Sequence, residues 1–244
     1  IVLTSSALSN NTTGVSNVAV GQNSMRDSVT ARFNVGIGRD TLLNTTGSFN
    51  TAIGYQTMLN NTSGESNVGL GYQTLYSNTT GGDNVAIGYQ ALYNNTTAQY
   101  NVAVGYFAMQ KNTTGQYNVG IGYRAVRENT TGVQNVGVGF DALRENTTGF
   151  RNVAVGFGVL NSNTFGDSNV GMGDEALFTN TTGTNAVAIG RRALYSNISG
   201  DNNIGIGLQA LFNNTVGENN VAMGTNAMYT STTGANNVAI GFET

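Results

Sequence analysis

Apolar and polar residues alternate along this chain in a pattern that returns every 17 residues. Its centre is a pentapeptide of the form Asn-Val-Ala/Gly-Ile/Val-Gly, in which two apolar positions flank a small one. The pentapeptides begin at Asn17, Asn34, Asn50, Asn67, Asn84, Asn101, Asn118, Asn135, Asn152, Asn169, Ala186, Asn203, Asn220 and Asn237. Every interval is 17 residues except the 16 between Asn34 and Asn50. A fixed period of this length predicts a solenoid, in which each coil buries its apolar side chains against its neighbours.

Two apolar rows are expected to build the interior of this solenoid. Val85 and Ile87 are β-branched and two residues apart, so in a strand they point to the same side. We expect this pair and its equivalents to fill the interior, with Thr51 the one polar member. A second row, represented by Leu92, is expected to close the core from the opposite wall. The segment 89–93 after the strand has room for only a short strand or a single helical turn. We therefore expect the fold class to be all-β.

The residue between the two β-branched positions is always Ala or Gly. The row contains Ala19, Gly36, Ala52, Gly69, Ala86, Ala103, Gly120, Gly137, Ala154, Gly171, Ala188, Gly205, Ala222 and Ala239. If the β-branched pair points inward, this row points outward, and only a closely packed surface would exclude larger residues. That surface could belong to the same chain or to another copy. The sequence favours another copy, because a closed coil has no second interior, and it predicts an oligomer face.

Glycine and asparagine recur at other fixed positions of the coil. Gly follows the strand in all fourteen pentapeptides, from Gly21 to Gly241, which predicts a positive φ or a corner too tight for a Cβ. A row of Asn precedes the Thr pairs at Asn61, Asn78, Asn95, Asn112, Asn129, Asn146, Asn163, Asn180, Asn197 and Asn214. Most of these begin an N-x-S/T sequon, so glycosylation is one interpretation. A buried amide ladder is the favoured one, because glycans one strand spacing apart would collide.

An aromatic residue follows the strand glycine in seven successive coils. These residues are Tyr55, Tyr72, Tyr89, Tyr106, Tyr123, Phe140 and Phe157. Stacked rings on an outer face are typical of a glycan platform, and equally of a seam between subunits. The seam is favoured, because Asp174, Arg191 and Thr225 interrupt the row without disturbing the repeat.

Composition excludes several chemical functions. The chain has no His, Cys, Pro or Trp, so histidine triads, thiol nucleophiles and the common zinc sites are absent, and no cofactor is predicted. The net charge of −3 with 9% charged residues argues against nucleic-acid binding, and no apolar run is long enough to insert in a membrane. Glu128 and Glu145, aligned in adjacent coils beside Arg127 and Arg144, could be paired catalytic carboxylates. Surface ion pairs are the favoured interpretation, and we expect no enzyme.

The repeat Ala86-Ile87-Gly88-Tyr89-Gln90-Ala91-Leu92-Tyr93-Asn94-Asn95-Thr96-Thr97, preceded by Asn84 and Val85, resembles two kinds of known repeat. It is similar to the head repeats of trimeric autotransporter adhesins, whose period is shorter, and to repeats of phage tail fibres and bacterial surface fibres. The resemblance covers nearly the whole chain. It implies a left-handed parallel β-roll and a homotrimer located outside the cell or on a virion.

The leading hypothesis is therefore a structural or adhesive fibre segment without catalysis, with residues 1–244 as one solenoid domain. Ile1-Val2-Leu3 occupies a strand position, so we expect a piece of a longer protein. Expected partners are further copies of the chain, side by side or end to end, and a glycan or protein on a host surface. The alternative is a glycan- or ice-binding solenoid. Ice binding is suggested by two Thr rows, represented by Thr96 and Thr97, although neighbouring residues of an extended segment cannot share one face.

Overall fold

The computed structural model describes residues 6–244 and, in that part of the chain, contains only short parallel strands and turns. The chain divides into two compact units, Ile1–Asn118 (unit 1) and Val119–Thr244 (unit 2). The strand position expected at Ile1-Val2-Leu3 lies outside the described residues.

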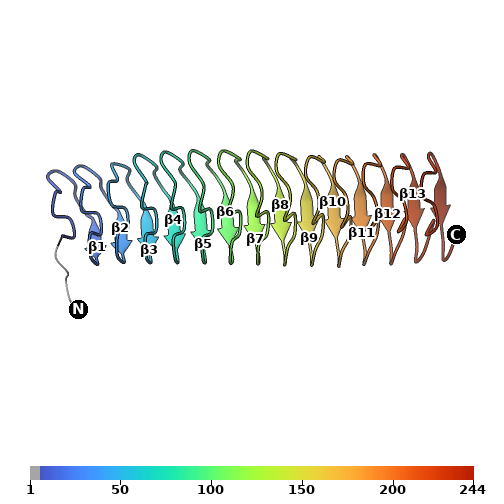
Figure 1. The fold of residues 1–244 in the computed structure, drawn as a ribbon, viewed down its shortest axis with the longest axis horizontal. Helices are drawn as coiled ribbons and strands as arrows, with labels where there is room; N and C mark the ends of the chain where they lie inside the picture. The colour runs from blue at the N-terminus through green and yellow to red at the C-terminus, as the bar shows by residue number, and fades with distance from the viewer. Residues whose placement is uncertain (1–5) are drawn as a thin grey trace. The chain divides into compact units, whose positions relative to one another are not determined.

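Unit 1 is a stack of coils that each contribute one three-residue strand. The strands are β1 (Val18–Val20), β2 (Val35–Ile37), β3 (Thr51–Ile53), β4 (Val68–Leu70), β5 (Val85–Ile87) and β6 (Val102–Val104). Successive strands pair in parallel and in register, as in Val85↔Val102 (Figure 1). The chain leaves each strand at its glycine and returns through turns to begin the next.

Unit 2 repeats the same arrangement. Its strands are β7 (Val119–Ile121), β8 (Val136–Val138), β9 (Val153–Val155), β10 (Val170–Met172), β11 (Val187–Ile189), β12 (Ile204–Ile206), β13 (Val221–Met223) and β14 (Val238–Ile240). They also pair in parallel with a one-coil offset, as in Val136↔Val153. The predicted all-β parallel solenoid with one turn per 17-residue repeat is confirmed.

The core runs along the inside of each stack, and one expected row lies there. Leu75 and Leu92 in unit 1, like Leu143 and Leu177 in unit 2, are fully buried. The row also includes Met25, Leu42, Met58, Met109, Val126, Leu160, Leu194 and Leu211, which are equally buried. The prediction of an inner Leu/Met row is therefore confirmed.

The strands face the opposite way from the prediction. Their central residue is the buried one: Ala86, Ala103 and Ala154 expose 0% of their surface. The flanking apolar residues point outward, and Val68 and Leu70 expose 37% and 44%. The prediction that the Val/Ile pairs are interior is wrong. The prediction that the Ala/Gly row forms an outer oligomer face is wrong for the same reason, because that row lies in the core of its own chain.

The width of the coil explains this orientation. Each coil encloses its Leu or Met, an Ala or Thr, and Asn side chains, which leaves little room beneath the strand. A Cβ added to Gly69 would lie 2.6 Å from Thr57 Cγ2 and 2.9 Å from Thr74 Oγ1. Only Gly or Ala therefore fits at the strand centre, and since strand side chains alternate in direction, the larger β-branched pair must face out.

The glycine that ends each strand has the special backbone that the sequence predicts. Its φ lies between 124° and 139° in every coil from Gly21 to Gly241. At Gly88 and Gly122 an added Cβ would also overlap the carbonyl oxygen of the next coil's glycine. Both conditions exclude a side chain, so the corner prediction is confirmed.

The segment after this glycine is neither the strand nor the helical turn considered for it. In the coil of β5, Gln90 and Leu92 adopt left-handed conformations with φ of 52° and 51°. The Gln90 amide donates to the Tyr72 carbonyl at 2.9 Å, and the Leu92 amide donates to the Ala108 carbonyl at 3.1 Å. The backbone therefore stays hydrogen-bonded from coil to coil although it is folded into turns.

The 16-residue interval leaves the strand register intact. Val35 still pairs with Thr51, so the missing residue is lost from the return turn. There Thr45 is fully buried, and its Oγ1 accepts a hydrogen bond from Asn61 Nδ2 at 2.9 Å. Thr45 thus takes the place that Asn fills in later coils.

We expect Gly122→Val to destabilise the protein by at least about 3 kcal/mol, because φ of 133° and the overlap with Gly139 both oppose a side chain. Chemical denaturation measures the change. Thr131→Val, at an exposed position of the same unit, is the control and should leave the midpoint nearly unchanged. Equal midpoints for the two variants would contradict the corner argument.

We expect Val126→Leu to stabilise unit 2 by about 0.5–1 kcal/mol. Val126 is β-branched yet holds φ at 52°, a conformation that β-branched side chains adopt with strain. The coil can hold Leu at this position. Leu194 is the equivalent residue of a later coil and faces a strand glycine, Gly205, just as Val126 faces Gly137. Val159→Leu enlarges a buried valine of ordinary φ and should bring no gain; a stabilisation equal to that of Val126→Leu would point to volume rather than strain.

Candidate interaction surfaces

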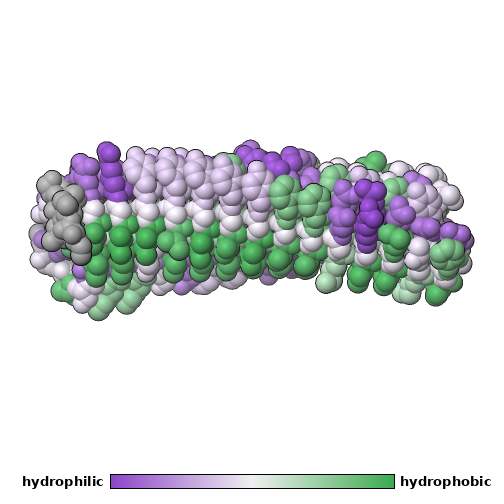
Figure 2. Space-filling view, turned by 90° about the horizontal axis from the view of Figure 1, so that it is seen from below, coloured by the Kyte–Doolittle hydropathy of each residue, from purple (hydrophilic) through white to green (hydrophobic). Residues whose placement is uncertain are grey.

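The outward strand residues form a continuous apolar band on each unit. We call the outward Val, Ile, Leu and Met residues of the strands the Val/Ile band. In unit 1 it includes Val18, Ile37, Val68 and Leu70, and in unit 2 Ile121, Met172 and Ile189, all more than a third exposed. In Figure 2 the green, hydrophobic strip runs along the molecule beside a pale row of near-neutral hydropathy. Thr51 is its one polar member, and it contains no charge.

The predicted Asn ladder is present in the core. Asn78 Nδ2 donates to Asn61 Oδ1 at 2.7 Å, and Asn95 Nδ2 donates to Asn78 Oδ1 at 2.8 Å. In unit 2 the same bonds join Asn129 to Asn146 and continue through Asn214. These side chains are fully buried, so their amide nitrogens lie within the fold and are not available to a glycan. The ladder interpretation of the sequons is confirmed.

A second Asn ladder was not predicted. From Asn34 to Asn220 the Asn that begins a pentapeptide is also buried, and its Oδ1 accepts from the backbone amide of the Asn in the next coil, as in Asn84 N to Asn67 Oδ1 at 3.0 Å. Its Nδ2 closes the turn by donating to a carbonyl, as in Asn84 to Ala98 at 2.9 Å. The sequence feature that could have predicted this second ladder is the Asn at the first position of thirteen of the fourteen pentapeptides, with Ala186 the exception.

The aromatic row stacks face to face. In unit 1 the ring centres of Tyr72 and Tyr89 are 5.0 Å apart with an angle of 4° between the planes. In unit 2 Tyr123, Phe140 and Phe157 continue the same geometry at 4.9 and 5.2 Å. Rings inside the row cover each other's faces and present only edges to the surface. A sugar stacks on ring faces, so this geometry disfavours a continuous glycan platform; the intersubunit seam stays a prediction.

Amide and phenol groups lie beside this row. Gln73 Nε2 donates to Gln56 Oε1 at 2.9 Å, and Gln90 continues the chain of amides. Tyr76 and Tyr93 stack beyond it at 4.9 Å. Burial raises the pKa of the Tyr93 hydroxyl, and the neighbouring phenols of Tyr76 and Tyr72 add to the effect. Tyr93 therefore remains a neutral phenol at physiological pH.

A group of charged residues in unit 2 forms ion pairs. Arg144 pairs with Glu145 at 2.9 Å, and Arg127 pairs with Glu128 at 2.9 Å. Arg124 makes a two-pronged contact with Asp141, at 2.9 and 2.7 Å, in the neighbouring coil. These contacts confirm the ion-pair interpretation of the Arg and Glu cluster.

The two Thr rows differ in exposure and bonding. Thr96 is partly buried, and its hydroxyl donates to the Thr113 carbonyl of the next coil at 3.1 Å. Thr97 is exposed. One row is thus occupied by coil-to-coil bonding, and the pair does not form the flat double array that an ice-binding face would use.

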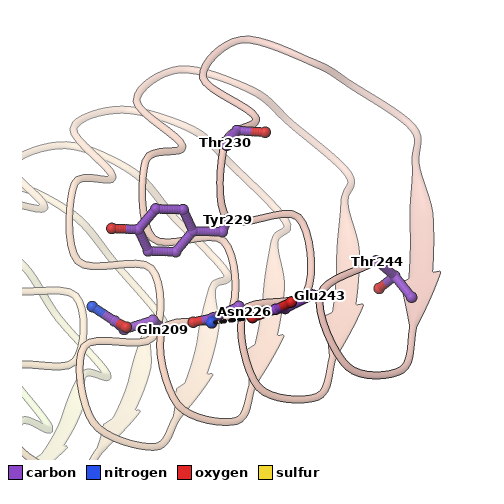
Figure 3. A pocket seen from close by; sticks show the side chains of 6 residues that line it. All are labelled: Gln209, Asn226, Tyr229, Thr230, Glu243 and Thr244. Carbon is purple, nitrogen blue, oxygen red and sulfur yellow. Dashed lines mark hydrogen bonds between the residues drawn. The ribbon is translucent and has the colours of Figure 1, made fainter.

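A hollow of about 490 Å³ lies on the last turns of unit 2. Figure 3 shows three polar side chains in line across successive turns, with an aromatic and a hydroxyl side chain above them. Its lining residues are Gln209, Asn226, Tyr229, Thr230, Glu243 and Thr244.

Comparison with known proteins gives no family. No protein-family model matches the chain, and no curated protein sequence matches it. Among residues 6–244 there is no group of three or more acidic side chains placed to hold a metal ion. The described part of the chain also has no helix long and apolar enough to cross a membrane.

We expect Asn146→Leu to destabilise unit 2 by about 2–4 kcal/mol, because it leaves one of the two buried Asn163 amide hydrogens without its acceptor and removes the Asn146 amide donors to Asn129 Oδ1 and to the Gly149 carbonyl. The second Asn163 hydrogen stays bonded to the Gly166 carbonyl, and Asn135 still donates to the Gly149 carbonyl. Urea denaturation gives the change. Thr182→Leu places the same side chain at an exposed position and is the control. A loss no larger than the control's would mean that the ladder contributes little to stability.

Proposed function

We propose that the protein is a structural segment of an extracellular fibre in which identical chains associate side by side through the Val/Ile band. The observation that carries the proposal is the exposure of this band in the single chain. Val18 exposes 49% and Ile37 38% in unit 1, and Met172 exposes 43% in unit 2. Contiguous apolar surface of this kind on a soluble protein marks an interaction site.

The band offers many apolar side chains for an interface. Each strand contributes two outward positions, twelve in unit 1 and sixteen in unit 2. All of them except Thr51 are apolar, and none is buried in the single chain. A side-by-side partner that covers such a row would bury apolar surface along the length of the unit.

A second copy of the chain is the partner that this surface fits best. The band is free of charge and repeats at one strand spacing, so another copy presents an apolar surface with the same pitch. The charged side chains that pair in unit 2, such as Arg124 and Asp141, lie on the return turns and not on the strands. Identical chains that meet around one rotation axis form a closed symmetric oligomer, which is the common form of homo-oligomers.

Three chains are proposed because the repeat resembles those of trimeric adhesins, and the same resemblance supports a left-handed coil. In such an assembly the strand face is internal and the turns remain outside. The function is then mechanical: a fibre shaft or head segment of a surface adhesin or phage tail fibre, outside the cell or on the virion, without catalysis.

The test is a charge placed in the band. Because the strand face is not part of the chain's own core, Val138→Arg should leave each chain folded but oppose association, since several copies bring the same charge into a desolvated surface. We expect the wild-type chain to be an oligomer by sedimentation equilibrium, with a mass of three chains, and the variant to be a monomer with an unchanged circular dichroism spectrum.

Thr148→Arg adds the same charge on an exposed turn of unit 2 and should remain oligomeric. A wild-type chain that is monomeric at micromolar concentration would overturn the proposal. A variant that assembles as well as the wild type would show that the interface lies elsewhere. Thermal hysteresis by a monomeric wild type would favour the ice-binding alternative.

A further inference from the structure

In unit 1 the tyrosines stack on one another from coil to coil. The chain has eleven tyrosines, and eight of them lie in unit 1 as neighbours of another tyrosine one coil away. They form three arrays, here called the tyrosine arrays: Tyr55, Tyr72, Tyr89 and Tyr106; Tyr76 and Tyr93; Tyr100 and Tyr117. Phenylalanine rings would stack in the same way, so packing alone does not explain why these positions hold tyrosine. Tyrosine differs from phenylalanine in its phenol group, which can be oxidised.

The rings of each array are parallel and close. Tyr72 and Tyr89 lie 5.0 Å apart at 4°, and Tyr76 and Tyr93 lie 4.9 Å apart at 5°. Tyr100 and Tyr117 lie 5.0 Å apart at 7°. This spacing keeps the ring carbons next to the hydroxyl-bearing carbon of one tyrosine within reach of those of its neighbour when the rings turn. Tyr100 and Tyr117 expose 46% and 53% of their residue surface, so an oxidant can reach them.

We propose that the tyrosine arrays are sites of oxidative coupling, in which dityrosine bonds join successive coils of one chain. A one-electron oxidant of the haem-peroxidase class, with hydrogen peroxide, removes one electron and one proton from each of two neighbouring phenols. The two phenoxyl radicals combine through a bond between their Cε carbons. The two hydrogens on those carbons then move to the phenol oxygens. The pair has lost two hydrogen atoms, and the peroxide has become two water molecules.

The fold favours coupling within a pair over coupling elsewhere. Backbones of neighbouring coils are held about 4.8 Å apart by their strand bonds, so each phenol has a partner within reach at all times. Rotation about χ2 brings the facing rings edge to edge, and this torsion is broad for tyrosine. The Gln56–Gln73–Gln90 ladder beside the longest array helps to keep the coils in register while the rings turn.

Unit 2 supplies an internal control. Tyr195 lies between Phe178 and Phe212, with ring centres 5.4 and 5.2 Å away. Tyr229 stacks on Phe212 at 5.2 Å. Phenylalanine has no hydroxyl hydrogen to lose, so these stacks have the same packing and cannot couple. Each dityrosine in unit 1 would close a loop of one coil and restrict the unfolded chain, as a disulfide does.

The experiment treats the full chain with horseradish peroxidase and hydrogen peroxide and maps the linked peptides by mass spectrometry. We expect blue dityrosine fluorescence, peptides that lack two hydrogen atoms, and links confined to neighbours in the arrays, such as Tyr76 to Tyr93. A denaturing gel should show the mass of a single chain, because the links lie within it. The treated protein should melt several degrees higher than the untreated one.

Tyr72→Phe should remove the links from residue 72 to Tyr55 and Tyr89, and leave the Tyr76–Tyr93 and Tyr100–Tyr117 links within twofold of wild type. Tyr195→Phe is the matched control and should change none of them. Urea-unfolded chain should give a severalfold lower yield of these pairs. Links scattered over all tyrosines, links that join two chains, or a yield no higher than that of the unfolded chain would each overturn the proposal.

Discussion

Each position of a coil lies one strand spacing from the same position of the next coil, and every other feature of the structure depends on this repetition. The backbone amides of strands and turns alike donate to the adjacent coil, as Gln90 does to Tyr72. A buried polar side chain must then find its partner in the same direction. Asparagine meets this condition because its amide both donates and accepts, so a row of asparagines satisfies itself. Phenol rings, glutamines and the Arg124–Asp141 pair follow the same rule on the surface.

The narrow interior sets the second constraint. Turning the chain within 17 residues requires left-handed backbone at three non-glycine positions per coil, for instance Gln90, Leu92 and Tyr100. Each costs on the order of 1 kcal/mol relative to a right-handed residue. The ladders offset this strain, because turn amides that would otherwise be buried and unpaired bond to the next coil. The strain is therefore tolerated only as part of a stack, and one isolated coil would not retain this conformation.

The same narrowness produces the surface on which the proposed assembly rests. A wider coil would hold the Val/Ile pair inside and leave a polar exterior. Here the interior admits only Ala or Gly beneath the strand, so the most hydrophobic side chains of the repeat are turned to solvent. Their exposure is unfavourable in a single chain and becomes favourable when a second apolar surface covers them. The proposed association of chains would therefore depend on this one choice of strand orientation, which is made when the chain folds.

The sequence by itself determined the period, the parallel stacking, the buried Leu/Met row, the glycine corners and the first Asn ladder. Each depends on residue type at a fixed interval, and the interval alone brings like residues together. Only the tertiary structure decided which face of the strand is inside. A Val-Ala-Ile segment alternates equally well in either direction, and hydrophobicity favoured burying Val85 and Ile87 rather than Ala86. The decision depends on the space left by Leu92, Asn95 and the turns, and that space exists only once the coil has closed.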